Sequence, residues 1–589
     1  MSLMRSWLLG ALLCAAPAAN ASSADLAIDW GRDLNAGLAQ AEREGKPVLL
    51  YLEAVWCHWC HVMDQETYGD SDVQQAVLSG FVPVRLDQDA HPDLSIRYRR
   101  WGWPATVILD AKGNDLAKRQ GFVPADKFAA LLTKIAANPE PETDDQAARQ
   151  SQPPLAADEL SQRLQANHLR SHDDVRGGLK SAQKYVDRDT VEWDLALAYS
   201  GDADAAARAR RTLSAALNLL DPAWGGFYQY STHRDWVHPH FEKRTELQGD
   251  YLRIYTLGWA QLGEPEYLNA AKATAGYARR FLAAPDGGFY ASQDADLKQG
   301  EHSEDYFALG DTERMAMGVP RIAPQTFARE TAAMVEGLAT LAEYSGDRQA
   351  LIEADRNGRW LMAERRLPGG GYRHGAESDQ RLHLGVQLRV GRAFLALYRA
   401  TSQRAWLNEA IAVTAVIDQH LRAPESGYYS IPPAQSTLPP VRDLSAQISL
   451  ARYTNLLGHY SGNSVHREMA AHALLQLRKP DVAFSSFTEP GILLALNEHA
   501  RDPLHVTVVG PRPTPLSATL YAAGAQLPGW YKRLEWWDRG EGPLPNPDIA
   551  YPPSRKPAAF VCTERRCSVP LRSPDALREF LTENQRTTP

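Results

Sequence analysis

The sequence carries little excess charge of either sign and few cysteines. Its 589 residues have a formal net charge of −8, and Lys and Arg are interspersed with Asp and Glu. A surface with such a mixture has no excess of basic side chains to bind nucleic acids or anionic membranes. We therefore expect no nucleic-acid partner. With only five cysteines, the chain is no disulfide-dense small domain. Its length predicts two or three domains that are stable without disulfide staples.

Residues 1–21 are expected to be a secretory signal peptide. Arg5 supplies a positive charge, Trp7 to Ala16 form an apolar stretch, and Ala19 to Ala21 form a small-residue cleavage site. The apolar stretch is too short to span a bilayer comfortably, although an uncleaved anchor is the alternative. We therefore expect an exported, periplasmic protein that has no membrane contact after cleavage.

Signal cleavage would also remove Cys14. The remaining cysteines form two close pairs, Cys57/Cys60 and Cys562/Cys567. An exported compartment permits disulfides, and an even set leaves no odd reactive thiol.

The block Trp56–His61, with the sequence WCHWCH, has the spacing of a dithiol redox centre. A cysteine at the first turn of a helix faces unpaired N–H groups that stabilise a thiolate, so Cys57 is the expected nucleophile and Cys60 the resolving thiol. His58 can add positive charge beside the thiolate. A static disulfide and half of a zinc site are the alternatives. A metal needs about four ligands, and the second cysteine pair is distant in the sequence, so we expect neither a metal nor a cofactor.

Around this block, residues 22–138 alternate strand and helix patterns in β-α-β and β-β-α order, which resembles the thioredoxin superfamily. The resemblance implies that Pro104 is a cis-proline beside the dithiol. Many thioredoxin-like proteins hold a buried acid six residues before the first cysteine. Here that position is Tyr51, and the nearest acid on the same side of the strand is Glu53. These two residues are the candidates for proton transfer.

After a Pro- and Glu-rich linker over residues 139–154, residues 155–500 are helical almost throughout. Gly-Gly-aromatic turns recur between the helical segments, for example Gly225–Tyr228. Helical hairpins closed by such turns form an internal repeat, and six of them would close into an (α/α)6 toroid. An open solenoid is the alternative, but the sequence shows no polar capping repeat.

Residues 501–589 return to strand and helix patterns and predict a small α/β appendage. Cys562 and Cys567 flank a short turn between two strands there. A hairpin disulfide is the simplest interpretation, and a second redox pair that exchanges with Cys57/Cys60 is the alternative.

The loops of the helical region hold aromatic rings, acids and imidazoles, which are the side chains that stack on a sugar and hydrogen-bond to it. The candidate site residues are Trp224, Trp236, His238, His240, Glu242, Asp294 and Asp296. The competing interpretation is structural, because aromatic residues after Gly-Gly turns also pack between hairpins and buried acids tie down loops.

Several blocks across the chain resemble the family of highly divergent thioredoxin-domain proteins that includes the spermatogenesis-associated thioredoxin-like protein. They are Trp56–Met63, Gly102–Pro104, Pro239–Lys243, Gln293–Asp296, and the ending Phe560–Cys562 with Cys567. The resemblance implies a helical body similar to the N-acylglucosamine 2-epimerase and six-hairpin glycosidase toroids. A fold does not fix a function.

Three hypotheses follow from the sequence. The first is an exported thiol-disulfide oxidoreductase that acts on client protein thiols or disulfides, with the toroid as a client- or glycan-binding body. The second is a carbohydrate-active toroid, an epimerase or glycosidase that takes a saccharide, with an accessory thioredoxin domain. The third is a binding scaffold without either activity.

Overall fold

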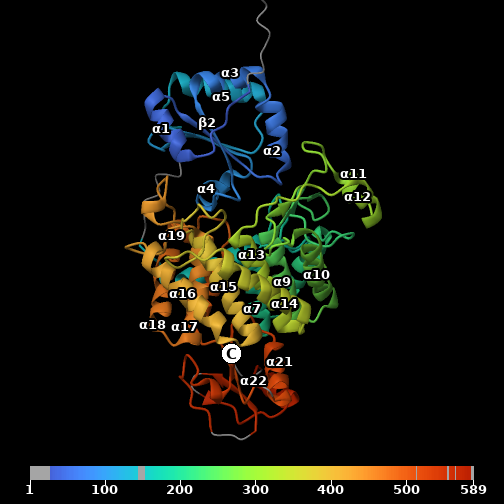
Figure 1. The fold of residues 1–589 in the computed structure, drawn as a ribbon. Coiled ribbons are helices and arrows are strands. Elements are labelled where there is room, and N and C mark those ends of the chain that lie inside the picture. Colours follow the sequence, from blue (N-terminus) through green and yellow to red (C-terminus); the bar gives the residue numbers. More distant parts are fainter. Residues whose placement is uncertain (1–26, 143–152, 513, 553–555, 564–565, 586–589) are drawn as a thin grey trace, which may run out of the picture.

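The computed structural model describes residues 27–142, 153–512, 514–552, 556–563 and 566–585. These form an α/β domain, a helical body and a small C-terminal α/β domain, arranged one after another along the long axis of the molecule (Figure 1). This arrangement confirms the predicted fold class. The expected signal peptide, residues 1–21, and most of the expected linker lie outside the described residues.

The N-terminal domain is built on a four-stranded sheet in the order β2-β1-β3-β4. Strand β1 pairs parallel with β2 and antiparallel with β3, and β4 is antiparallel to β3. The strands are β1 (Val48–Glu53), β2 (Val82–Asp87), β3 (Ala105–Leu109) and β4 (Asp115–Gln120). The helices are α1 (Leu34–Glu44), α2 (His58–Val62), α3 (Ser71–Gly80), α4 (Pro92–Tyr98) and α5 (Ala125–Ala137).

The apolar sequence of β1 follows from its burial on both faces. Val48 and Leu50 pack on the side of the sheet that α1 and α4 cover. Leu49 and Tyr51 pack on the opposite side with α3 and α5. The sheet is therefore covered on both faces, and the dithiol follows its central strand.

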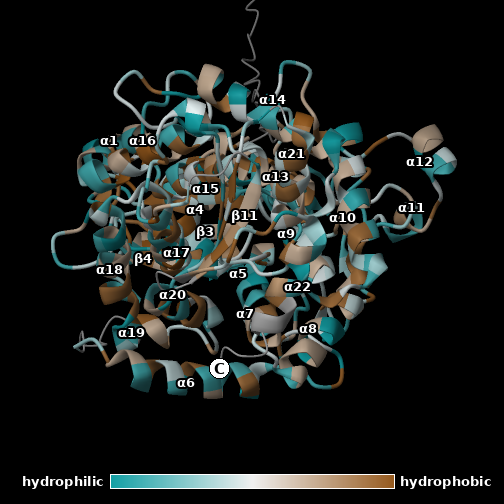
Figure 2. Cartoon of the chain, turned by 90° about the horizontal axis from the view of Figure 1, so that it is seen from below, coloured by the Kyte–Doolittle hydropathy of each residue, from teal (hydrophilic) through white to brown (hydrophobic). Residues whose placement is uncertain are grey.

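The helical body is a closed ring of helical hairpins. The inner helices are α7 (Arg188–Tyr199), α9 (Thr245–Leu262), α13 (Ala328–Ser345), α15 (Leu384–Thr401), α17 (Leu444–Ser461) and α20 (Pro490–Ala500). The outer helices are α8 (Ala203–Ala216), α10 (Pro265–Tyr277), α14 (Arg348–Glu364), α16 (Arg404–Leu421), α18 (Ser464–Leu477) and α6 (Ala157–Ser171). Figure 2 shows these helices around the axis of the body.

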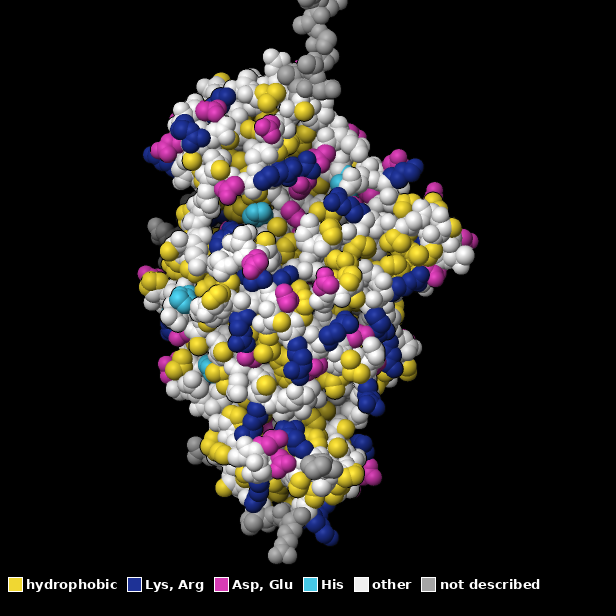
Figure 3. All heavy atoms as spheres, in the orientation of Figure 1, with side chains coloured by type: hydrophobic (Ala, Val, Ile, Leu, Met, Phe, Trp, Pro, Cys, Tyr) yellow, Lys and Arg dark blue, Asp and Glu magenta, His cyan; other side chains and the backbone are white. Residues whose placement is uncertain are grey.

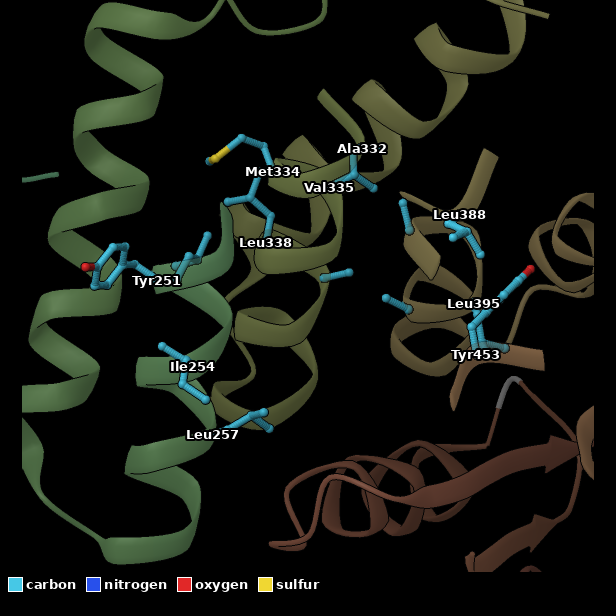
Figure 4. Packing of buried hydrophobic residues seen from close by; sticks show 14 of the residues in the cluster. Tyr251, Ile254, Leu257, Ala332, Met334, Val335, Leu338, Leu388, Leu395 and Tyr453 are labelled. Carbon is cyan, nitrogen blue, oxygen red and sulfur yellow. The ribbon is translucent and has the colours of Figure 1, made fainter. Parts of the chain in front are cut away.

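Contacts between neighbouring helices close the ring. Each inner helix contacts the next one along the chain, and α20 contacts both α17 and α7. Helix α6, the first of the body, pairs with α20, the last. The described body is therefore an (α/α)6 toroid rather than an open solenoid. Figure 4 shows apolar side chains of α9, α13 and α15, such as Ile254, Val335 and Leu388, in the packing between inner helices.

The Gly-Gly-aromatic turns are held by glutamines of the inner helices. The Gln248 side chain accepts a hydrogen bond from the backbone N–H of Phe227 and donates one to its carbonyl, both at 2.7 Å. Gln387 does the same for Tyr372, and Gln447 for Tyr428. Gly226 has a φ of 73°, and a Cβ there would lie 2.5 Å from the Tyr277 ring. Glycine is therefore required at this turn.

Short elements project from the rim of the ring that faces the N-terminal domain. β5 (Tyr230–Ser231) pairs with β6 (Pro239–His240), and β7 (Lys243–Arg244) pairs antiparallel with β8 (Ser292–Gln293). Helices α11 (Glu304–Phe307) and α12 (Asp311–Met317) follow β8 and stand out from the body in Figure 1. Helix α19 (Pro480–Ala483) precedes α20.

The C-terminal domain has a four-stranded sheet in the order β10-β9-β11-β12. Its elements are β9 (Leu504–Val509), α21 (Pro515–Ala525), β10 (Lys532–Trp537), β11 (Ala558–Thr563), β12 (Arg566–Cys567) and α22 (Pro574–Gln585). Cys562 and Cys567 are register partners of β11 and β12 and form a disulfide. This hairpin bridge lies at the end of the molecule opposite the N-terminal domain (Figure 1), so the arrangement offers no direct exchange with Cys57/Cys60.

The surface agrees with the charge pattern of the sequence. Figure 3 shows basic and acidic side chains intermixed over the visible face, without a patch of one sign. Within the described residues, no helix combines the length and the apolar character that crossing a membrane requires.

A buried ion cluster joins the C-terminal domain to the ring. Glu343 of α13 pairs with Arg399 of α15 at 2.8 Å and with Lys532 of β10 at 3.1 Å.

We expect Glu343→Gln to lower the free energy of unfolding by about 3–5 kcal/mol, because it leaves two buried cations without their carboxylate. Chemical denaturation would measure the loss. Asp355→Asn is the control, since it removes a solvent-exposed pair with Arg359 and should cost about 0–1 kcal/mol.

The loss in Glu343→Gln should depend on pH. Burial lowers the pKa of Lys532 to about 8. Below that pH the amine is charged and needs Glu343. Above it, Lys532 is neutral in the folded protein with or without Glu343, so its share of the loss disappears. The difference between variant and parent should therefore be larger at pH 6.5 than at pH 9. An equal loss at both values would contradict this account.

Candidate redox site at the domain junction

The dithiol lies at the junction of β1 and α2. Cys57 is the N-cap residue of α2, and its Sγ accepts a hydrogen bond from the backbone N–H of Cys60 at 3.2 Å. Cys57 and Cys60 form a disulfide. A sulfur atom at an N-cap faces the unpaired N–H groups of the first turn, which favour negative charge there. The local geometry thus suits a Cys57 thiolate.

Aromatic side chains enclose the disulfide. Trp56 and the two cysteines form one buried apolar cluster, and Trp103 packs against it. The Trp103–Pro104 peptide bond is cis, as the resemblance to the thioredoxin superfamily implies. Cys57 is 4% exposed and Cys60 is fully buried, whereas Trp59 is 39% exposed. Trp59 and the neighbouring Phe122 ring, 6.0 Å away between centroids, therefore form the accessible flank.

Tyr51 and Glu53 have fixed partners. The Tyr51 hydroxyl donates a hydrogen bond to the Cys60 carbonyl at 3.2 Å. Burial raises the pKa of Tyr51 well above its usual range, so the hydroxyl stays protonated. Glu53 forms an ion pair with Arg85, which also pairs with Asp64. The role of Tyr51 and Glu53 in proton transfer stays a prediction.

A carboxylate from the helical body holds the two histidines of the dithiol motif. Asp296, which follows β8, accepts hydrogen bonds from Nδ1 of His58 at 2.8 Å and from Nδ1 of His61 at 3.0 Å. Nε2 of His61 lies 3.2 Å from the Val55 carbonyl. When both ring nitrogens donate, the His61 ring is an imidazolium. His61, which follows Cys60 in the motif, is thus hydrogen-bonded to a residue 235 positions away in the sequence.

The electrostatics agree with this pairing. Burial opposes the ionisation of Asp296, but the hydrogen bonds from His58 and His61 outweigh it and lower the pKa of Asp296 to about 2. Burial also opposes protonation of His61, yet its hydrogen bond to Asp296 and the charges of Asp294 and Asp296 raise its pKa above the usual value. The pairing therefore favours a carboxylate at Asp296 and a protonated ring at His61.

The pairing of β7 with β8 brings other candidate residues to the same place. Lys243 is the register partner of Gln293, so Glu242 and Asp294 extend from the same end of the pair. Glu242 and Asp294 are both buried. Burial is the main reason that the pKa of Glu242 rises to about 8 and that of Asp294 to about 6.

His240 and His302 complete the surroundings. The His302 ring lies over the His58 ring, with 4.3 Å between centroids. His240 stacks on Tyr230 at 4.4 Å, and its Nδ1 lies 3.8 Å from Glu242. Burial, followed by the charges of His58 and His302, lowers the pKa of His240 to about 4. Four of the candidates from the helical loops, His240, Glu242, Asp294 and Asp296, thus gather beside the dithiol.

The remaining loop candidates lie elsewhere. Trp224 is buried, donates to Asp311 at 2.7 Å and packs on Phe281. Trp236 is buried and donates to the Arg176 carbonyl at 2.8 Å. His238 pairs with Asp235 at 2.8 Å and is exposed. Their described contacts are structural, and the structure does not bring them to the dithiol.

Three contributors are not among the site residues expected from the sequence. His61 had a signal, because it follows the second cysteine and lies three residues after His58 on the same helical face. His302 and Arg244 had none. The Arg244 guanidinium lies over the Trp56 ring, 5.0 Å from its centroid, and only the fold brings them together.

A cavity of about 390 Å³ lies between the N-terminal domain and the inner helices of the ring. Arg99 and Trp103 of the N-terminal domain line one side, and Arg244, Glu246 and Arg389 of the body line the other. Arg389 pairs with Glu246 at 3.0 Å and with Asp250 at 2.8 Å. The ring thus has a polar, charged cavity at the end that the dithiol domain covers.

Comparisons with known proteins find similarities in different parts of the chain. Residues 20–152 match a family model named Thioredox_DsbH and described as a protein of unknown function, DUF255. The chain is 27% identical over 304 residues to spermatogenesis-associated protein 20 of Mus musculus, a match that covers 45% of this chain and 38% of that one. It is 33% identical over 135 residues to the thiol:disulfide interchange protein DsbD of Cronobacter sakazakii, covering 22% of each chain.

Among solved structures, a sugar epimerase from a ruminal bacterium is similar with a TM-score of 0.43 and 14% identity, over 55% of this chain and 87% of that chain. The chain spans less than half the length of the curated relatives described above. Within residues 20–152 the chain therefore contains a DsbD-like thioredoxin domain of the family described as a protein of unknown function, DUF255, and the chain is homologous to spermatogenesis-associated protein 20.

Proposed function

We propose that this chain is an exported thiol-disulfide oxidoreductase of the periplasm, with Cys57 as the nucleophile and Cys60 as the resolving thiol. The observation that carries the proposal is the Cys57–Cys60 disulfide with Cys57 Sγ at the N-cap of α2. The signal-like residues 1–21 and the likeness to DsbD support the periplasmic location.

The exchange balances without a cofactor. The Cys57 thiolate attacks one sulfur of a client disulfide, so a mixed disulfide forms and the other client sulfur leaves as a thiolate. The Cys60 thiolate then attacks Cys57 Sγ, which releases the second client thiolate and forms the Cys57–Cys60 disulfide. The client is reduced by two electrons and the protein is oxidised by two. The reverse sequence oxidises a client dithiol, and the potential of the partner couple sets the direction.

The helical body contributes to this chemistry through Asp296. Its carboxylate fixes the orientation of His58, the residue next to Cys57, and of His61. Positive charge beside a cysteine lowers the pKa of its thiol and favours the reduced form of the couple. The loops of the body also cover one side of the dithiol. A client therefore approaches over the exposed Trp59 and the half-buried Phe122, which offer an apolar surface.

A second function is favoured by the cavity of about 390 Å³ under the N-terminal domain. Its volume suits a small ligand. Its Arg389, Glu246 and Asp250 side chains offer hydrogen bonds to a polyhydroxylated molecule, so a saccharide is the ligand that we propose for it.

The oxidoreductase proposal predicts covalent trapping. Cys60→Ser should accumulate mixed disulfides between Cys57 and client proteins, because no thiol remains to resolve them. Non-reducing electrophoresis and mass spectrometry of protein isolated from the periplasm would detect them. The Cys57→Ser/Cys60→Ser double variant is the control and should trap nothing. Absence of adducts in Cys60→Ser at every glutathione poise would overturn the proposal.

His58 should tune the potential of the couple. We expect His58→Phe to lower the reduction potential of Cys57/Cys60 by about 30 mV, equal to about 1.4 kcal/mol, because the thiolate loses an adjacent imidazole. Equilibration with glutathione buffers would measure it. His420→Phe, which changes an exposed histidine of the outer helix α16, should leave the potential unchanged. An unchanged or higher potential in His58→Phe would contradict this role.

Saccharide binding and the dithiol chemistry can be tested separately by mutation. Asp250→Asn should weaken saccharide binding by about tenfold, since one lost charged hydrogen bond is worth about 1.5 kcal/mol or more. Cys57→Ser should bind the sugar as the parent does. Calorimetric titration with a panel of monosaccharides would test both variants. If no member of the panel binds the parent, the cavity is not a monosaccharide site.

A further inference from the structure

Three residues with metal-binding side chains converge beside the disulfide from two domains. His61 belongs to α2 of the N-terminal domain, and Asp294 and Asp296 follow β8 of the helical body. One nitrogen or oxygen atom from each of the three lies within 4.8 Å of the other two. All three residues are buried.

The Asp294 carboxylate has one oxygen without a hydrogen bond. Its side chain is fully buried, and its Oδ2 lies 3.7 Å from Nε2 of His61. No described residue donates a hydrogen bond to that oxygen. Glu242 Oε2 is buried in the same way and also accepts none from the described residues. Burying a carboxylate oxygen without a partner is costly, and a cation removes that cost.

We propose that His61, Asp294 and Asp296 bind one divalent metal ion of the zinc class, which bridges the N-terminal domain and the helical body. One imidazole nitrogen and two carboxylate oxygens are a ligand set that suits zinc and leaves a fourth position for a water molecule or for Glu242. The inference does not depend on the redox function, because neither cysteine is a ligand.

Neighbouring groups orient the ligands as outer-shell groups do in metal sites. Nε2 of His61 faces the Val55 carbonyl at 3.2 Å, so a proton on Nε2 leaves Nδ1 as the ligand atom. Nδ1 of His58 donates to Asp296 Oδ1 at 2.8 Å, while Asp296 Oδ2 faces His61. The hydrogen bond that joins His61 and Asp296 is replaced by two bonds to the metal, and the ring proton is released.

These ligands could not be found from sequence spacing. The dithiol block supplies two cysteines and two histidines, and the second cysteine pair, which could complete a zinc set, is distant in the sequence. The structure supplies the other ligands from residues 294 and 296, more than two hundred positions away. The ligands are then His61 and two aspartates, and the cysteines remain available for exchange.

The test uses the full chain with its disulfides oxidised, freed of metal by dialysis against a chelator. Calorimetric titration with Zn²⁺ should give about one ion per chain. Asp294→Asn and Asp296→Asn should each weaken binding by at least about tenfold. Asp235→Asn, which removes the exposed pair with His238, is the matched control and should bind as the parent does. Binding that is weak or unchanged across all four proteins would overturn the site.

Two further measurements exclude cysteine ligation and misfolding. The Cys57→Ser/Cys60→Ser variant should still bind one Zn²⁺, whereas loss of binding there with retention in Asp294→Asn would overturn the proposal. Co²⁺ bound to the unmutated protein should lack the intense thiolate-to-cobalt charge-transfer band. That spectrum needs no variant, so it decides the ligand type even if an aspartate substitution prevents folding. Failure of these tests would leave mixed-disulfide trapping by Cys60→Ser unaffected, so the two proposals fail separately.

Discussion

The pairing of Asp296 with His58 and His61 is the contact on which the arrangement of the N-terminal domain depends. It joins the dithiol motif to the helical body through buried hydrogen bonds of 2.8 and 3.0 Å. Burying a carboxylate or an imidazole is costly unless it is paired. The pairing across the junction reduces that cost for Asp296 in one domain and for His58 and His61 in the other. The position of the His302 ring beside the His58 ring follows from this docking.

Much of the fold could be predicted because it depends on patterns of residues that are close in the sequence. The alternating strand and helix patterns of residues 22–138 indicated an α/β domain, and the repeated Gly-Gly-aromatic turns indicated hairpins. Each turn is fixed by its own chemistry, a positive φ at glycines such as Gly226 and a glutamine such as Gln248 that clamps the following residue. The partner of α6 could not be predicted. It pairs with α20, the last helix of the ring, and only closure of the ring determines that contact.

The dithiol of the site could be predicted from the sequence. The residues of the helical body that surround the dithiol could not be placed there. Cys57 and Cys60 follow from spacing, since an N-cap position depends on its immediate neighbours. Asp294 and Asp296 were recognised as candidates and assigned to a sugar site, because residue type shows what a side chain can bind and not where it points. Trp224 and Trp236 illustrate the same limit. Their indole rings are of the type that stacks on sugars. Their N–H groups, however, donate to Asp311 and to the Arg176 carbonyl within the body.

The charge environment of the dithiol is consequently a property of the whole chain. An isolated N-terminal domain would keep the N-cap hydrogen bond from the Cys60 N–H to Cys57 Sγ, which is local. It would lose the carboxylate that holds His58 and His61, because Asp296 belongs to the body. The His61 ring would then lose the hydrogen bond and the charge of Asp296, both of which raise its pKa. The nucleophile is thus set by the thioredoxin fold, and the orientation of the histidines beside it is set by the toroid.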